Sequence, residues 1–441
     1  MATPHGKSAL HNLIQEESRL QTGFILFPHR RGGACPSREI CAKMATTGRR
    51  YGIVCFFVFI AGRGVIDAPL QFVHCFYRIF ILIWICPAFG DIITCGRIDL
   101  MKKYLIPDEG NFYKANLHSH STVSDGELTP EQMKEMYMKE GYSIIAFTDH
   151  CRFVTHNELS DGNFLALNGV ENAADEQGKL RFYDRCCDVC YIALSPERKL
   201  HPFQTEGDVK GDGEFSPFSV SYCAGDVNMM IETGRKNGFF TTYNHPTWSL
   251  ENYEQYMSYK GMHAMEIFNQ SSAVDGYDEY NAAIYDDLLR SGKRLFCIAT
   301  DDNHNRAPNT CHWDSFGGFT MIKAPSLKYE DVTDALLKGN FYASRGPIIN
   351  ALWLDTEDWS VHIQCEKAVK MVCTRGGRRC RAVFAKEQGV DYLTEVKFSV
   401  NSTDKYFRIT VFDENGMTAD TNAYFVDTLG IDFDDENLFV E

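Results

Sequence analysis

The first residues that could do chemistry lie close together, in the stretch 116–126, NLHSHSTVSDG. His118 and His120 are two apart, and residues with this spacing point to the same side of a β-strand, so both imidazoles can reach one metal ion. Asp125 follows in a Ser-Asp-Gly turn that can bring a carboxylate to a neighbouring position. A single His-x-His pair is weak evidence, so the interpretation depends on whether other parts of the chain offer ligands to the same point.

Further candidate ligands stand at the ends of predicted strands. They are His150 in FTDH, Glu171 in GVE, His245 in NHP, and Asp302 and His304 in TDDNH. Side chains of these types are seldom buried without partners. In a β/α barrel the carboxyl ends of the strands meet on one face, where active sites lie. We therefore expect these side chains to converge on one metal site.

The elements that must position these residues alternate between strand and helix. Strands are predicted at 113–117, 143–148, 164–170, 189–194, 239–243, 264–268, 295–300 and 318–323, and helices from Thr129-Pro130 to Gly141 and at 224–237, 277–291 and 329–338. Residues 196–222 read as a long polar loop. About seven such units in roughly 250 residues favour a closed β/α barrel with parallel strands over an open sheet.

The two ends of the chain differ in residue pattern from the alternating strands and helices between them. Residues 349–441 are mainly strand-like, with a turn at 413–416, and predict a small antiparallel β domain ending in a solvated acidic stretch, 432–436. Residues 1–100 are basic, with a net charge of +5, and hold two apolar runs, 52–62 and 80–89, both too short to span a membrane. Three interpretations stay open for them: an over-extended start with Met101 as the true one, membrane attachment, or a genuine N-terminal region.

Composition narrows the class of function. The formal net charge is -15 and the pI about 5.4, which argues against stable binding of long nucleic acid. The spacing of the sixteen cysteines does not repeat, so we expect a reducing compartment and a cytoplasmic protein rather than a disulfide framework.

The candidate ligands are imidazoles and carboxylates, a mixture that suits Zn, Mn or Fe. They outnumber the ligands of one ion, so two or three divalent ions are expected. Adjacent ions that share a carboxylate can deprotonate a water and neutralise charge that develops on a phosphoryl or acyl oxygen.

The order of these motifs resembles the polymerase and histidinol phosphatase (PHP) family. HSHSTVSDG, FTDH, GVE, NHP and TDDNH follow one another over about 112–348, and the later YASRGPI and β-rich region are similar to the stand-alone metallohydrolases of that family. The resemblance implies a distorted (β/α)7 TIM-like barrel at 101–348 with a trinuclear metal site.

Carried over by motif, the resemblance implies three ligand sets. His118, His120, Glu171 and Asp302 would hold the first ion, Glu171 and His245 the second, and Asp125, His150 and His304 the third. The family places a further His on the strand after the glutamate, where this chain has Cys190. A thiolate can bind zinc, but cysteine is also a common buried strand residue, and both interpretations stay open.

Three more residues are candidates for catalysis. Arg152 and Arg345 could grip a phosphate, or form surface ion pairs. Asp301, like Asp149, could orient ligand histidines, or cap a loop.

The expected function is metal-dependent hydrolysis of a phosphate ester by a metal-activated hydroxide. The partner would be a small phosphorylated molecule, such as a phosphomonoester or nucleotide, or the 5′ end of a short oligonucleotide. No membrane is expected if the chain starts at Met101. The alternatives are a 5′-3′ exonuclease on short RNA or DNA, a non-catalytic metal-binding module, and a metallohydrolase of C–N or C–O bonds.

Overall fold

The computed structural model describes residues 102–178, 184–204, 220–306 and 313–429, together with four strands between residues 39 and 94. Contacts divide the chain into two units, Met1–Leu100 and Met101–Glu441. In the first unit β1 (Glu39–Ala45) pairs with β2 (Val54–Ile60), and β3 (Ile83–Ile85) with β4 (Ile92–Thr94), all antiparallel. The two apolar runs noted in the sequence therefore contain β2 and β3. Within the described parts of the chain, every helix is too short or too polar to cross a membrane.

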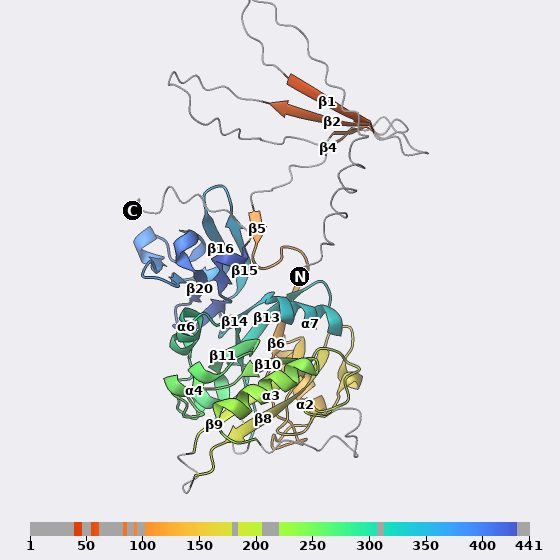
Figure 1. Ribbon diagram of the computed structural model, residues 1–441, viewed down its shortest axis with the longest axis vertical. Helices are drawn as coiled ribbons and strands as arrows, with labels where there is room; N and C mark the ends of the chain where they lie inside the picture. The colour runs from red at the N-terminus through yellow and green to blue at the C-terminus, as the bar shows by residue number, and fades with distance from the viewer. Residues whose placement is uncertain are drawn as a thin grey trace, which may run out of the picture. The chain divides into compact units, whose positions relative to one another are not determined.

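One large sheet carries most of the second unit (Figure 1). Its strands up to residue 344 are β6 (Asn111–Asn116), β7 (Ile144–Phe147), β8 (Leu165–Asp175), β9 (Cys186–Ala193), β10 (Phe239–Tyr243), β11 (Ala264–Asn269), β12 (Phe296–Thr300), β13 (Phe319–Ala324) and β14 (Phe341–Ser344). The order in space is β12-β11-β10-β9-β8-β7-β6-β13-β14. Each strand predicted before residue 330 is present, with bounds shifted by a few residues.

The strand directions are mixed, which corrects the expectation of a parallel sheet. β6, β7 and β8 run parallel, as do β10, β11 and β12. β9 is antiparallel to both of its neighbours, and β13 is antiparallel to β6. The reason at β9 is its connection, because β8 and β9 follow each other directly as a hairpin, whereas a parallel neighbour requires a longer crossover.

The sheet curves around one apolar core but does not close as a backbone ladder among the described strands. Side chains from each strand between β6 and β13 share a buried cluster with α7 (Tyr329–Lys338). β12 lies beside β13, where the Thr320 hydroxyl donates to the carbonyl of Ala299 (3.0 Å) and accepts its N–H (3.3 Å). A side chain thus joins the two strands where a closed barrel would have a ladder.

The helices lie between these strands in the chain. They are α2 (Pro130–Lys139), α3 (Ala224–Lys236), α4 (Tyr253–Ser258), α5 (Gln270–Val274), α6 (Ala282–Arg290) and α7. The predicted start of α2 is confirmed, because Thr129 caps it together with Gln132 and Pro130 occupies the first turn. α6 begins five residues later than predicted, since Asn281 is its N-cap and Tyr280 forms a bridge with Phe268.

The C-terminal strands are antiparallel, as expected. β15 (Ile349–Asp355), β16 (Ser360–Ala368) and β19 (Leu393–Ser399) form a second sheet with β5 (Lys102–Tyr104), whereas β17 (Lys370–Arg375), β18 (Arg381–Phe384), β20 (Tyr406–Phe412), β21 (Thr418–Thr421) and β22 (Tyr424–Phe425) extend the large sheet from β14. Strands from both sides of the predicted boundary at 348/349 therefore share a sheet.

The predicted turn at 413–416 is confirmed, because Asp413 accepts the N–H groups of Asn415 and Met417. The acidic stretch 432–436 lies outside the described residues, as does most of the loop expected at 196–222.

Candidate metal centre

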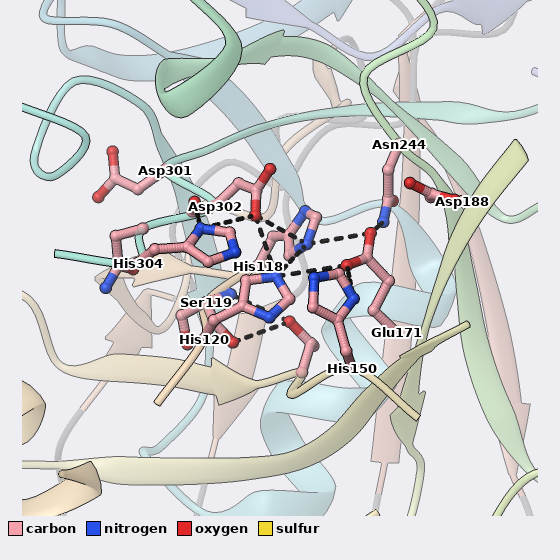
Figure 2. A network of polar contacts seen from close by, with 12 residues as sticks. His118, Ser119, His120, His150, Glu171, Asp188, Asn244, Asp301, Asp302 and His304 are labelled. Atoms are coloured by element: carbon pink, nitrogen blue, oxygen red, sulfur yellow. Dashed lines mark hydrogen bonds and ion pairs between the residues drawn. The ribbon is translucent and has the colours of Figure 1, made fainter. Parts of the chain in front are cut away.

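Histidines and carboxylates that lie in or follow five strands of the second unit, β6, β7, β8, β10 and β12, turn toward one another (Figure 2). Three of the groups whose donor atoms lie within 4.8 Å of one another meet here: His118, His120 and Asp302; His118, Glu171 and His245; and His120, Asp125, His150 and His304. The structure thus brings together eight of the nine residues expected as ligands. Their roles as ligands stay predictions.

The first group has the spacing of ligands around one ion. His118 Nε2 lies 3.1 Å from His120 Nε2, and Asp302 Oδ1 lies 3.2 and 3.0 Å from these two atoms. The Glu171 carboxylate adds contacts of 3.2 and 3.3 Å to the same two nitrogens. Ligands at about 2.0–2.1 Å from a tetrahedral zinc ion are roughly 3.3 Å apart, so this arrangement fits a divalent cation.

Two further groups adjoin the first. In one, His245 Nε2 lies 3.4 Å from Glu171 Oε1, which places Glu171 between two possible ions, as expected. In the other, Asp125 Oδ1 lies 3.4 Å from His304 Nε2 and 3.8 Å from His150 Nε2. His120 faces this group as well, through Nδ1 at 3.8 Å from Asp125.

Neighbouring acceptors select the nitrogen that each ring presents. The buried Glu266 on β11 accepts from His118 Nδ1 at 2.8 Å, and the carbonyl of Asp302 lies 3.0 Å from His304 Nδ1. Because a carboxylate and a carbonyl accept, these Nδ1 atoms carry the protons and Nε2 is left with a lone pair for a metal ion. Glu266 also accepts the backbone N–H of His245 at 2.8 Å, so one carboxylate positions two expected ligands.

The electrostatics of the cluster favour bound positive charge. Burial alone would lower the pKa of His120, but hydrogen bonds to Asp302 and Glu171 and their charges raise it to about 9. The pKa of His245 rises to about 10 against the same burial penalty, through Glu171 and the nearby carboxylates. Burial would raise the pKa of Glu171, yet the charge of His118 holds it well below its usual value. Glu171 thus remains ionised and attracts cations.

Backbone strain is concentrated at two of these residues. Asp302 has φ +52° and His245 has φ +23°, a region that residues other than glycine rarely adopt. Hydrogen bonds hold both, from the Asp302 N–H to the His118 carbonyl (2.9 Å) and from the His245 N–H to Glu266. Strain of this kind is found at functional sites, where the surrounding structure maintains it.

A further observation indicates that this set of donor atoms is suited to a metal centre. His120 Nδ1 is buried and has no hydrogen-bond partner among the described residues. Its Nε2 faces the first group, so a proton on Nδ1, which lies 3.8 Å from the carboxylate of Asp125, would leave the lone pair of Nε2 for an ion. The residues present therefore fit the two or three ions expected from the sequence.

Cys190 lies next to the centre but outside the three donor groups. It pairs with Glu171 across β8 and β9, and its sulfur accepts a hydrogen bond from Asn244 Nδ2 at 3.0 Å. Burial raises the pKa of its thiol to about 12.

The same face of β9 carries a buried carboxylate that sequence reasoning missed, Asp188, whose Oδ2 lies 3.7 Å from His245 Nε2. The available signal was its spacing of two from Cys190.

The two aspartates that were candidates for orienting ligand histidines, Asp149 and Asp301, anchor loops. Asp301 accepts the backbone N–H groups of residues 316–318 and the hydroxyl of Tyr137 at 2.8–3.0 Å. Figure 2 shows it apart from the network that links the ligand side chains. Asp149 accepts from the backbone and hydroxyl groups of Ser121 and Ser124. These contacts favour loop capping over an orienting role for both, and they give the catalytic role expected of Asp301 no support.

A cavity of about 410 Å³ opens onto the donor groups. Its lining includes Asp125, His150, Glu171, Asp188, His245, Trp248, Asp302, His304, Arg306 and Asp314. Trp248 is 38% exposed and meets His245 edge to face, at 5.0 Å between ring centroids. The site is therefore open to a small molecule.

The arginine in this cavity is Arg306, which sequence reasoning missed. It pairs with Asp125, and its side chain is 58% exposed. Among the described residues that line the cavity, it alone carries a permanent positive charge. Neither expected arginine is part of the lining. Arg345 is half-buried and stacks over Phe268, 4.1 Å from the ring centroid, whereas Arg152 is exposed. The only sequence signal for Arg306 was its position two residues after His304.

No family model matches the chain, and no curated protein matches it. Among solved structures, a two-domain protein from Bacteroides vulgatus that contains a predicted PHP-like metal-dependent phosphoesterase aligns at 14% identity and a TM-score of 0.35, over 74% of this chain and 98% of its own. A protein named as a metal-dependent phosphoesterase, from Bifidobacterium adolescentis, aligns at 13% identity and a TM-score of 0.30, over 46% and 91%. An amidohydrolase from Chromobacterium violaceum, solved with sulfate and no metal, aligns at 15% identity and a TM-score of 0.30, over 43% and 87%. The chemistry of this chain is therefore inferred from its own side chains.

Proposed function

We propose that this chain is a metal-dependent phosphoesterase that acts on a small phosphorylated substrate. The observation that carries the proposal is the placement of Glu171 between two adjacent donor groups, with contacts of 3.2 Å to His118 and 3.4 Å to His245. Sites with adjacent ions suit displacement at phosphorus, because both the attacking and the leaving oxygen can be stabilised. The order of the five motifs supports the same class.

The chain's own residues define what each part of the site does. His118, His120, Glu171 and Asp302 would hold one ion, while Asp125, His150 and His304 would hold another. Bound ions would supply a nucleophile at neutral pH by lowering the pKa of water, and would offset the negative charge of the carboxylates, which otherwise repels phosphate. Arg306 stands at the cavity with a guanidinium suited to bind phosphate oxygens.

The cavity favours a small substrate over long nucleic acid. Its volume of about 410 Å³ suits a molecule of metabolite size. Asp275 and Asp314 add negative charge to its lining, and the chain as a whole carries a charge of -15. Phosphomonoesters and nucleotides are therefore the first substrates to test, and short 5′-phosphorylated oligonucleotides the second.

The test uses the full chain loaded with Mn²⁺ or Zn²⁺. Phosphomonoesters, nucleoside bisphosphates and 5′-phosphorylated oligonucleotides are assayed beside amide substrates. We expect phosphate release that His120→Ala abolishes and that His362→Ala, a substitution in the C-terminal sheet, leaves unchanged. Cleavage of amides alone, or of none of these compounds by the metal-loaded protein, would contradict the proposal.

A further inference from the structure

Asp188 is a buried carboxylate that none of the assigned roles uses. It lies on β9, where its backbone pairs with Ala173 of β8 and its carbonyl accepts the N–H of Asn244 at 3.0 Å. The residue is 6% exposed, yet its side chain contributes to the lining of the cavity that opens onto the metal centre. Figure 2 shows it beside Asn244, on the side of the cluster where Glu171 lies.

The two oxygens of this carboxylate have different surroundings. Oδ2 lies 3.7 Å from His245 Nε2 and 3.6 Å from the sulfur of Cys186, which donates to it. Oδ1 is buried and has no hydrogen-bond partner among the described residues. Buried carboxylates are normally paired, hydrogen-bonded or bound to a metal. An oxygen left without a partner beside a ligand histidine therefore indicates a missing cation.

Cys190 is less suited to bind that cation. Residues 188 and 190 point to the same side of β9, so both face the cluster. The sulfur of Cys190, however, already accepts the amide of Asn244 at 3.0 Å, and the same amide donates to Glu171 Oε1 at 2.8 Å. Asn244 thus occupies the space in front of the thiol, while Asp188 Oδ1 has no partner among the described residues.

We propose that Asp188, rather than Cys190, is the ligand that β9 contributes to the ion held by Glu171 and His245. This inference rests on the metal centre of the proposed function and deepens it. An oxygen donor here in place of a nitrogen or sulfur makes this second position harder in character. It should favour Mn²⁺ or Fe²⁺ relative to a site completed by histidine or thiolate.

The test is the number of ions that the full chain retains. Wild type and variants are stripped with a chelator, reloaded with Mn²⁺, separated from free metal and measured by inductively coupled plasma mass spectrometry. Asp188→Asn should lose about one ion per chain, because the amide keeps the size of the side chain and removes its charge. Cys190→Ser should keep the wild-type number.

Two controls separate Asp188 from its surroundings. Asp175, Cys186 and Asp188 also lie within 4.8 Å of one another, so Asp175→Asn tests whether the ion belongs to that outer group instead. Asp188→His offers a nitrogen donor and should regain the ion, which a purely structural role would not predict. The metal-free Asp188→Asn protein should melt no lower than metal-free wild type, because the substitution removes a buried charge whose Oδ1 has no hydrogen-bond partner among the described residues.

The outcomes are distinct. Loss of the ion in Cys190→Ser with retention in Asp188→Asn would overturn the inference, and so would equal loss in Asp175→Asn. If Asp188→Asn does not fold, retention of the full number of ions by Asp188→His supports the inference and loss of one ion overturns it. Phosphate release is measured separately: a wild type that binds the ions but cleaves no phosphoester contradicts the proposed function and leaves the ligand assignment standing.

Discussion

At the scale of single residues, the metal centre depends on Glu266, which is itself expected to bind no ion. Its carboxylate accepts from His118 Nδ1 at 2.8 Å, from the N–H of His245 at 2.8 Å and from the hydroxyl of Thr300 at 2.6 Å. It therefore fixes the ring orientation of one ligand and the strained backbone of another. Partners of this kind set the affinity of the ligands that they hold.

We predict that Glu266→Gln weakens metal binding by roughly 10- to 100-fold, because an amide no longer offers the same charged acceptor to His118. The measurement is competition with a chelator of known affinity. Glu135→Gln, on the exposed side of α2, is the control and should bind metal as the wild type does. Wild-type affinity in Glu266→Gln would show that Glu266 does not hold the imidazole.

Arg306 is the residue that we expect to recognise phosphate. Its guanidinium pairs with Asp125 at the cavity that opens onto the donor groups. An arginine at the entrance of an acidic site can contact the phosphate group of a substrate before that group reaches the metal ions. A loss of Arg306 should therefore act on substrate binding more than on turnover.

We predict that Arg306→Ala raises KM about tenfold, the effect of losing roughly 1.4 kcal/mol of binding free energy, with little change in kcat. The matched control is Arg152→Ala, which removes an exposed arginine outside the cavity lining. Steady-state kinetics on the best substrate of the panel distinguish the two. An equal rise of KM in Arg152→Ala would return the phosphate-binding role to that residue.

At the scale of elements, β12 and β13 lie side by side at a seam where the backbone ladder of the sheet is interrupted. This seam brings Asp302, which follows β12, close to His118, which follows β6. Asp302 follows β12 and must reach His118 at the end of β6, and β13 lies between these two strands. The link across the seam is the buried hydroxyl of Thr320, bonded to both backbone groups of Ala299. This single side chain stands in for two backbone hydrogen bonds.

We predict that Thr320→Val lowers the free energy of unfolding by about 1–3 kcal/mol, because it keeps the shape of the side chain and leaves buried backbone groups of Ala299 without partners. Chemical denaturation of the metal-free protein measures the loss. Thr320→Ser retains the hydroxyl and should recover most of it. An unchanged midpoint in Thr320→Val would mean that the seam is held by other contacts.

Local signals in the sequence account for much of this fold. The start of α2 was predictable because Thr129, Pro130 and Gln132 act within one turn. The reversed direction of β9 was not, since it depends on which strands pair across the sheet. Convergence of His118, His245 and Asp302 could be expected from their places at strand ends. Arg306, in contrast, resembles any surface arginine in sequence. Asp188 offered only its spacing of two from Cys190, because the missing hydrogen-bond partner of its Oδ1 is visible in the structure alone.

At the scale of the whole molecule, every residue of the donor groups and of the cavity belongs to the unit Met101–Glu441. The four described strands of the first 100 residues contribute none of them. The chemistry is thus expected to be independent of the unit Met1–Leu100.

We predict that a chain beginning at Met101 binds the same number of ions and turns over phosphoesters at the rate of the full chain. Metal analysis and initial rates at equal protein concentration provide the comparison. A loss of activity that returns when residues 1–100 are supplied would contradict this prediction.

The central claim, that adjacent metal groups in this chain hydrolyse phosphoesters, is tested most directly by titrating metal into the stripped protein and following phosphate release. We predict no turnover without metal, and activity that rises with added Mn²⁺ or Zn²⁺ until at least two ions per chain are bound. Full turnover in the metal-free protein, or saturation at a single bound ion, would contradict it.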